Sequence, residues 1–361
     1  YNLPDSSCVP AVRLYLSSDG EVVVSMRVVS NQLKRVHQEQ GVPLFYLTRV
    51  ADACPSQTKG NFMNSDALST KDVILARQAD RAGRRIQVFI VVKTAPTPSK
   101  TYVDTVCVAG LVVHPGPLRW VRLYPVPFRH LDFERQFPKY SIVEVDVTAP
   151  THGDGRPESL RVKDFNRITV LEETRSSSVR RHEIMGRVEP TTACVLNRGA
   201  RIDPGGATSL GLVVPIDPRI EISVSEGWSE SQKRTIELNQ AQLALDLGAT
   251  LRRDASPLES PPFQAWYIYR CEANGCRTHR QGILDWELTA LQRRAQKEGG
   301  DVWSWIKDRF ETVMLSPDRS TRFVLGNQAS GHKRHTFSVL SVYYPKKRDV
   351  SRAMMASSVL F

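Results

Sequence analysis

Three side chains that can bind a metal lie within nine consecutive positions of this sequence: Cys271, Cys276 and His279. Thiolate sulfur and imidazole nitrogen are ligands that zinc prefers, and structural zinc sites usually have four ligands in a tetrahedral arrangement. Gly275 permits a tight turn between the ligands. The spacing therefore predicts a zinc knuckle that stabilises a small core, rather than a site that catalyses a reaction.

The fourth ligand of this site is not evident from the residues next to the three. His332 and His335 lie in a basic loop between two expected strands and could reach across the sheet, as could Asp285. The alternative to a metal site is that Cys271 simply ends a buried strand, with the other two side chains present by chance.

Two carboxylates follow the knuckle, because Asp285 and Glu287 flank Trp286. On a strand they would share one face and could hold Mg²⁺ for phosphodiester cleavage. At the start of a helix, Asp285 would instead be the N-cap, and Glu287 would lie in the first turn, where the helix dipole favours negative charge. We favour the helix start, so no catalytic residue is predicted, and a metal-dependent nuclease that uses Asp285 and Glu287 is the alternative.

Residues 119–129 read R-W-V-R-L-Y-P-V-P-F-R and combine arginines with aromatic side chains. On a strand, Trp120, Arg122 and Tyr124 share one face, and such a face could stack on a base and contact its phosphate. The same pattern is typical of cation–π pairs on a solvated barrel surface, which is the alternative. We predict that the following residues contact nucleic acid: Arg119, Trp120, Arg122, Tyr124 and Arg129, helped by Lys333 and Arg334.

The composition is that of a basic globular protein. The 361 residues include 49 Lys and Arg against 38 Asp and Glu, a formal net charge of +11, and such an excess favours polyanionic partners. The six cysteines are scattered apart from the last pair, so we expect a reducing cytoplasm rather than a disulfide-bonded secreted protein. No apolar run approaches the roughly 20 residues that span a bilayer, so no membrane partner is expected.

Periodicity and turn signals divide the chain into four regions and predict a mixed α+β fold. Residues 1–85 contain a β-hairpin around an Asp-Gly dipeptide and a helical segment. Residues 86–170 hold four or five short strands, which predict a β-barrel-like module in the size class of OB and PUA-like folds. Residues 171–260 form a mixed polar and helical connecting region. Residues 261–361 alternate strands and helices around the zinc knuckle, which predicts an α+β module with a basic tail.

Several blocks of the sequence resemble segments that recur in a family of uncharacterised bacterial proteins. T-V-C-V-A-G, R-W-V-R-L-Y-P-V-P-F-R and G-R-P-E-S-L-R lie between residues 86 and 162. C-x4-C-x2-H with D-W-E-L, and F-V-L-G-N-Q followed by T-F-S-V-L, lie between residues 263 and 345. The resemblance covers about half the chain and implies that these segments belong to one recurrent unit. It implies no reaction, fold or ligand.

Together these patterns predict a cytoplasmic nucleic-acid-binding protein. It would act as a recognition or adaptor component in nucleic-acid metabolism or in defence against foreign nucleic acid, and its ligand could be DNA or RNA. Two alternatives stand beside this interpretation: the metal-dependent nuclease, and a protein–protein scaffold subunit of a nucleoprotein complex. In the second alternative, the basic face lies near nucleic acid that a partner protein holds.

Overall fold

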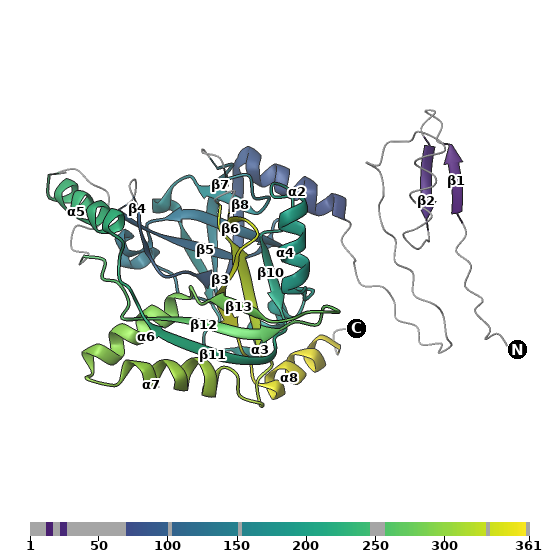
Figure 1. Ribbon diagram of the computed structural model, residues 1–361. Helices are drawn as coiled ribbons and strands as arrows, with labels where there is room; N and C mark the ends of the chain where they lie inside the picture. Colours follow the sequence, from purple (N-terminus) through teal and green to yellow (C-terminus); the bar gives the residue numbers. More distant parts are fainter. Residues whose placement is uncertain are drawn as a thin grey trace, which may run out of the picture. The chain divides into compact units, whose positions relative to one another are not determined.

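The computed structural model describes the chain in seven stretches: residues 12–16, 22–26, 70–99, 103–150, 154–245, 257–329 and 333–358. The chain divides into two compact units, Tyr1–Asp66 and Ala67–Phe361. In the first unit, strands β1 (Val12–Leu16) and β2 (Val22–Met26) pair antiparallel on either side of the Asp-Gly dipeptide, as the sequence predicts. The second unit carries all of the predicted site residues, and its helices and strands are labelled in Figure 1.

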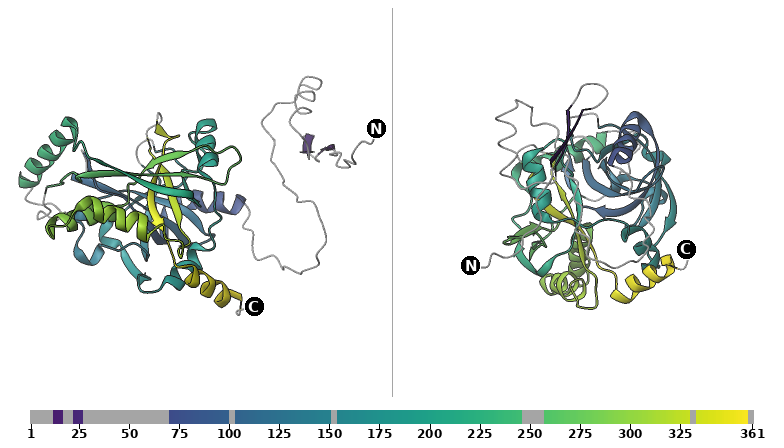
Figure 2. Two further views of the ribbon diagram at one scale, coloured as in Figure 1. Left: turned by 60° about the horizontal axis from the view of Figure 1, so that its bottom comes forward. Right: turned by 90° about the vertical axis from the view of Figure 1, so that its right-hand side faces the viewer.

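A closed β-barrel forms the first half of the second unit. Its strands are β3 (Arg84–Lys93), β4 (Thr97–Ser99), β5 (Val103–His114), β6 (Arg119–Val126), β7 (Ser141–Thr148), β8 (Ser159–Val162) and β9 (Thr169–Glu173). Five of them close in the order β3–β5–β6–β8–β7, because β7 pairs back onto β3. All neighbours are antiparallel except β6 and β8. The curved barrel strands are seen in the right-hand view of Figure 2, and short strands β4 and β9 extend the sheet.

The barrel is buried on its inside and on part of its outside. Along β3, Val88 and Ile90 belong to the barrel interior, whereas Phe89 and Val91 pack with apolar side chains from outside the barrel. A strand that is covered on both faces reads as a continuous apolar run, which explains the sequence of residues 88–92. The outer cover includes Leu212 and other residues of a second sheet.

Two three-stranded antiparallel sheets complete the unit. The first contains β10 (Leu210–Val213), β14 (Arg322–Asn327) and β15 (Phe337–Tyr343), and the second contains β11 (Ile216–Val224), β12 (Phe263–Arg270) and β13 (His279–Gly282). Their inner side chains share one core, in which the rings of Tyr267 and Phe323 stack at 4.4 Å.

The helices are α2 (Thr70–Gly83), α3 (Ser178–Met185), α4 (Ala193–Ile202), α5 (Glu230–Leu245), α6 (Trp286–Lys297), α7 (Val302–Lys307) and α8 (Lys347–Ser358), and a π-helical turn (Asp308–Val313) continues α7. Among the described residues, no helix combines the length and the apolar character that a membrane span needs.

The segment between β13 and α6 joins the barrel to these sheets through backbone contacts. Thr94, directly after β3, forms an antiparallel bridge with Asp285, and the N–H of Ala95 donates to the carbonyl of Leu284 at 2.7 Å. On the other side, Ile283 forms a parallel bridge with Val339 of β15. The unit is therefore a mixed α+β fold with a closed five-stranded barrel, which confirms the predicted class, and Asp285 lies where its two halves meet.

Candidate metal centre

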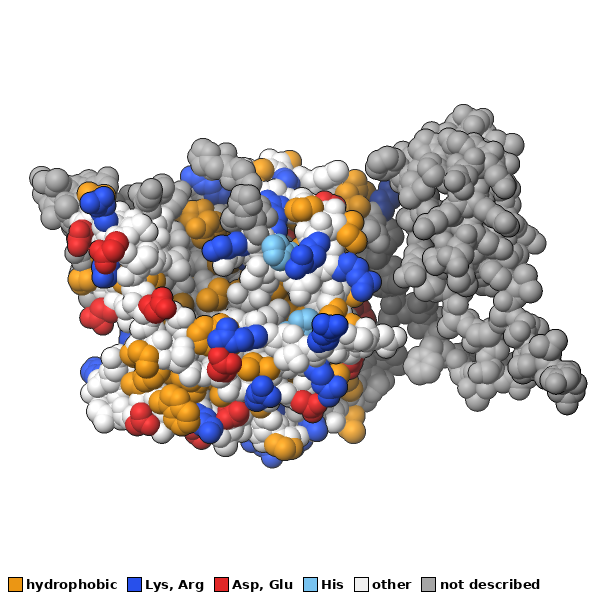
Figure 3. All heavy atoms as spheres, in the orientation of Figure 1, with side chains coloured by type: hydrophobic (Ala, Val, Ile, Leu, Met, Phe, Trp, Pro, Cys, Tyr) orange, Lys and Arg blue, Asp and Glu red, His pale blue; other side chains and the backbone are white. Residues whose placement is uncertain are grey.

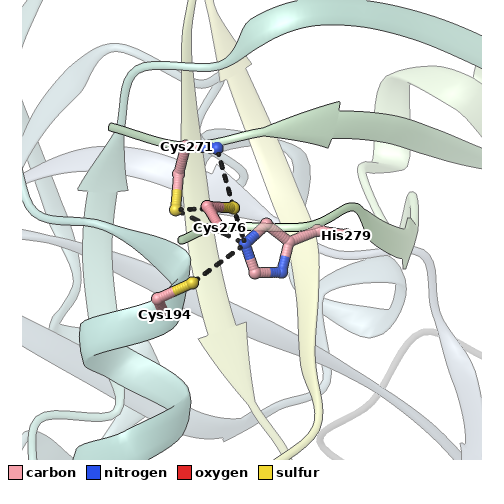
Figure 4. A group of neighbouring side chains, drawn as sticks. All are labelled: Cys194, Cys271, Cys276 and His279. Atoms are coloured by element: carbon pink, nitrogen blue, oxygen red, sulfur yellow. Dashed lines mark hydrogen bonds between the residues drawn. The ribbon is translucent and has the colours of Figure 1, made fainter. Parts of the chain in front are cut away.

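Four potential metal ligands come together at one end of the β12–β13 hairpin (Figure 4). Cys271 directly follows β12, Cys276 lies in the connecting turn, and His279 begins β13. The fourth is Cys194, in the first turn of α4. Their ligand atoms all lie within 4.8 Å of one another. The three residues of the predicted knuckle thus converge, and a cysteine from a distant helix completes the group.

The donor set and the distances fit a tetrahedral zinc ion. Zinc bonds of about 2.3 Å to sulfur and about 2.0 Å to nitrogen place tetrahedral ligand atoms roughly 3.5–3.8 Å apart. The Nε2 atom of His279 lies 3.5 Å from the sulfur of Cys194, 3.4 Å from that of Cys271 and 3.2 Å from that of Cys276. The sulfurs of Cys271 and Cys276 are 3.5 Å apart. Three thiols and one imidazole are a donor set typical of structural zinc.

Local structure on both elements positions these ligands. In the hairpin, Tyr269 pairs with His279 across the strands, and the N–H of Cys276 donates to the carbonyl of Ala273 to close the turn. Gly275 has a φ of 71°, which glycine adopts without strain. On α4, the side chain of Thr192 accepts from the N–H of Val195 and caps the helix, so Cys194 lies in a well-defined first turn.

The protein environment already affects the ionisation of the thiols. Burial raises the pKa of the Cys194 thiol to about 12. Burial also opposes ionisation of Cys271, but hydrogen bonds from backbone N–H groups and from His279 outweigh it and lower the pKa of the Cys271 thiol to about 6. Because cysteine binds zinc as the thiolate, a bound ion would displace the remaining thiol protons.

The fourth member of the group differs from the residues proposed from the sequence. His335 is not part of the cluster, and His332 lies outside the described residues. Asp285 is also outside the cluster, and its carboxylate pairs with Lys139. No single-sequence signal marks Cys194, because its position is set by the packing of α4 against the sheets and not by its spacing from the knuckle.

Asp285 and Glu287 occupy the start of α6 rather than a strand. The side chain of Asp285 accepts from the N–H of Glu287, which confirms the N-cap interpretation. Asp285 is 1% exposed and pairs with the buried Lys139 at 2.9 Å, and Glu287 contacts the same ammonium group at 3.1 Å. Because the carboxylate of Asp285 is buried and already paired, this arrangement does not present two acidic groups to a hydrated Mg²⁺ ion.

The charges in this pair influence one another strongly. Burial raises the pKa of the Asp285 carboxyl, against the pull of Lys139. Burial also opposes charge on Glu287, but Lys139 outweighs it and lowers the pKa of Glu287 below its usual range. For Lys139, the two carboxylates outweigh desolvation, so its pKa is raised. The ion pair therefore joins the start of α6 to Lys139, which lies just before barrel strand β7.

A second buried lysine lies near this pair without a carboxylate of its own among the described ion pairs. The Nζ atom of Lys93 donates to the carbonyl of Phe137 at 3.0 Å and lies 3.4 Å from the ring centre of Phe128 and 5.1 Å from that of Trp286. Desolvation, followed by the charge of Lys139, lowers the pKa of Lys93 to about 7. Aromatic faces and one carbonyl thus replace the water shell of this ammonium group.

The arginines of β6 that were predicted to contact nucleic acid are buried. The guanidinium group of Arg119 forms a fork with Asp80 of α2 at 2.8–2.9 Å. Arg122 is 2% exposed and donates to the carbonyl of Ser209 at 3.2 Å and to the sulfur of Cys107 at 3.1 Å. The two arginines lie on opposite faces of β6, and α2 covers the first while Ser209 covers the second. Neither guanidinium group therefore reaches solvent, and this corrects the prediction that they contact nucleic acid.

Most of the other residues proposed for that interface are buried, half-buried or already paired. Arg129 pairs with Asp104 at 2.7 Å and its side chain is 12% exposed. Arg334 is buried and donates to the carbonyls of Pro204 and Ala329. Trp120 is half-buried against the core outside the barrel. Among the seven residues, exposed side chains are found at two positions: Tyr124 and Lys333.

The fold and the site define a mixed α+β protein with a closed five-stranded barrel and a candidate Cys₃His metal centre. Residues 84–187 match a family model described as "Domain of unknown function (DUF8758)", and residues 189–359 match a second, described as "Domain of unknown function (DUF8757)". The first match spans the barrel, and the second spans the two sheets and all four ligands. No curated protein matches the chain.

Proposed function

We propose that this protein binds one structural zinc ion through Cys194, Cys271, Cys276 and His279. The observation that carries the proposal is the mutual distance of the four ligand atoms, all within 4.8 Å. Zinc here would tie the first turn of α4 to the end of the β12–β13 hairpin, two elements that are far apart in the sequence. All four positions of the tetrahedron are filled by protein ligands, as in structural sites, whereas catalytic zinc keeps one position open. A reducing cytoplasm would keep the thiols available.

We expect the purified protein to contain one zinc ion per chain by elemental analysis. Cys194→Ser should lower the zinc content strongly, because it removes one of the four ligands while leaving the knuckle intact. His335→Ala is the matched control, since it removes a ligand that the sequence suggested but that lies outside the cluster, and it should keep full zinc content. Wild-type protein without bound metal, prepared with zinc in the medium, would refute the proposal.

We infer nucleic-acid binding as a second function, in a recognition or adaptor role. What supports it is the net charge of +11 together with exposed arginines, such as Arg175 and Arg187, that take part in no ion pair within the described residues. Free guanidinium groups on the surface are available to phosphates. The barrel also suits the OB and PUA-like size class, and this supports the inference by analogy of architecture alone. A nuclease role for Asp285 and Glu287 is not proposed, because Lys139 already pairs with both.

We expect labelled single-stranded DNA, single-stranded RNA or duplex DNA to bind, with an affinity that falls steeply as salt rises. Each phosphate contact contributes about 0.9 to the slope of log affinity against log salt on duplex DNA, and about 0.7 on single strands. Fluorescence anisotropy over a salt series measures that slope. Absence of binding to all three probes would contradict this function and would favour the scaffold alternative, in which a partner protein holds the nucleic acid.

A further inference from the structure

Helix α4 carries two exposed arginines on the same face as the metal ligand Cys194. The buried stripe of this helix consists of Ala193, Leu196 and Ala200. Residues three to four apart lie on one face of a helix, so Arg198 lies one turn beyond Cys194 and Arg201 lies one turn further. Both arginines are exposed. The helix that supplies the fourth ligand therefore also presents a basic edge that begins at the metal centre.

The hairpin side of the centre carries further arginines. Arg277 is exposed and lies within the knuckle, between Cys276 and His279. Arg219, also exposed, pairs across the strands with Ile268 of β12. Two other arginines of this sheet are neutralised, because Arg270 pairs with Asp217 and Arg280 pairs with Glu221.

Four arginines around the centre are thus left without an ion pair in the part of the chain that the structure describes: Arg198, Arg201, Arg219 and Arg277. Figure 3 shows Lys and Arg side chains over the region of α4 and the zinc end of the hairpin, while acidic side chains are more frequent over α5 and α6. On the face that Figure 3 shows, basic side chains therefore gather toward α4 and this end of the hairpin.

We propose that this surface, formed by Arg198 and Arg201 of α4 with Arg277 of the knuckle, binds the phosphate backbone of nucleic acid. The inference rests on the nucleic-acid function proposed above and assigns it to a place. Its arginines come from two elements, and the metal centre lies between these elements. Zinc fixes α4 against the hairpin, so it also fixes the distance between the guanidinium groups that meet successive phosphates. The surface reads no base sequence, because phosphate contacts position a nucleic acid without identifying its bases.

A purely local role for the arginines is the competing explanation. One zinc ion with three thiolates and a neutral imidazole carries one negative charge in total, and Arg198 and Arg277 lie beside it. If they served only to offset that charge, their removal would weaken zinc binding, and any loss of nucleic-acid affinity would follow from the loss of zinc. If they contact phosphates, their removal would lower nucleic-acid affinity while the zinc content stayed the same.

The test is a triple variant, Arg198→Gln, Arg201→Gln and Arg277→Gln, prepared as the full chain. Its control is Lys233→Gln, Lys297→Gln and Lys307→Gln, which removes the same charge from exposed positions on α5, α6 and α7. We expect the arginine variant to lose affinity for nucleic acid by about tenfold or more and its salt slope to fall by about 2–3 on duplex DNA. The lysine variant should lose far less, and both should keep one zinc ion per chain.

The outcomes separate this inference from the function on which it rests. If wild-type protein binds nucleic acid and the arginine variant binds equally well, the surface is elsewhere and the inference is overturned while the function stands. If the arginine variant loses its zinc, the arginines stabilise the metal centre and the inference is again overturned. If wild-type protein binds none of the three probes, the proposed nucleic-acid function itself fails.

Discussion

Removing zinc with a chelator is expected to lower the free energy of unfolding by about 4 kcal/mol or more, if free zinc was about a thousand times its dissociation constant. The physical reason is linkage, since the ion binds a group of four ligands that exists in the folded chain only. Cys194 and the hairpin ligands come from separate elements that a bound ion would hold together. For a unit of this size, the loss corresponds to a fall of roughly 6 °C or more in Tm. Thermal unfolding with and without chelator, and after zinc is restored, measures it.

Two cysteine variants make this experiment specific. Cys194→Ser should abolish most of the difference between zinc-loaded and chelated protein, because the remaining three ligands bind the ion less tightly. Cys107→Ser should leave that difference unchanged, since Cys107 lies on β5 and is not part of the cluster. A Cys194→Ser protein that kept the full zinc-dependent rise in Tm would show that the ion is held by other residues.

The sequence predicts the local part of this site because its signals are local. Cys271, Cys276 and His279 are close enough in the chain for their spacing alone to indicate a knuckle. The same holds for Asp285, whose place before a helix predicts an N-cap, and the structure confirms it. Strand alternation and turn residues likewise predict a β-barrel-like module and the α+β class, because each strand carries its own pattern. The pairing of β7 with β3 that closes the barrel appears in the structure alone.

The remaining features depend on contacts between distant segments. Cys194 joins the knuckle only because α4 packs beside the β12–β13 hairpin. Arg119 is neutralised by Asp80, and nothing in the strand pattern shows that a buried carboxylate on α2 lies opposite. Trp120, Arg122 and Tyr124 share a face, as alternation predicts, but alternation cannot show whether that face meets water or another sheet. Here the face meets protein at Arg122, which is buried against Ser209, so the predicted interface is not formed at this residue.

Replacing Lys139 by Met is expected to lower the free energy of unfolding by about 3–5 kcal/mol, the usual result of leaving a buried charge without its partner. Lys139 is 8% exposed and its ammonium lies 2.9 Å from Asp285, which is 1% exposed. Without Lys139, the carboxylate would stay buried at the junction of the barrel and α6. Chemical denaturation of the full chain measures the change. As a matched control, Arg294→Met breaks the exposed pair with Glu298 and should cost at most about 1 kcal/mol.

A double-mutant cycle with Asp285→Asn tests whether the cost comes from the unpaired charge. Asparagine still caps α6, so the double variant should be less destabilised than the sum of the single changes, by on the order of 1–3 kcal/mol.

The free energy of unfolding of the Lys139→Met variant should also depend on pH. Burial raises the pKa of Asp285 above its unfolded value, and without Lys139 the folded state binds the extra proton. The contribution of this protonated carboxyl to stability is fully present below the unfolded pKa of Asp285 and falls as pH rises. The variant should therefore be destabilised less at about pH 5 than at about pH 7.5. Equal losses at both pH values, with additive effects in the cycle, would mean that Lys139 acts through packing and not through its charge.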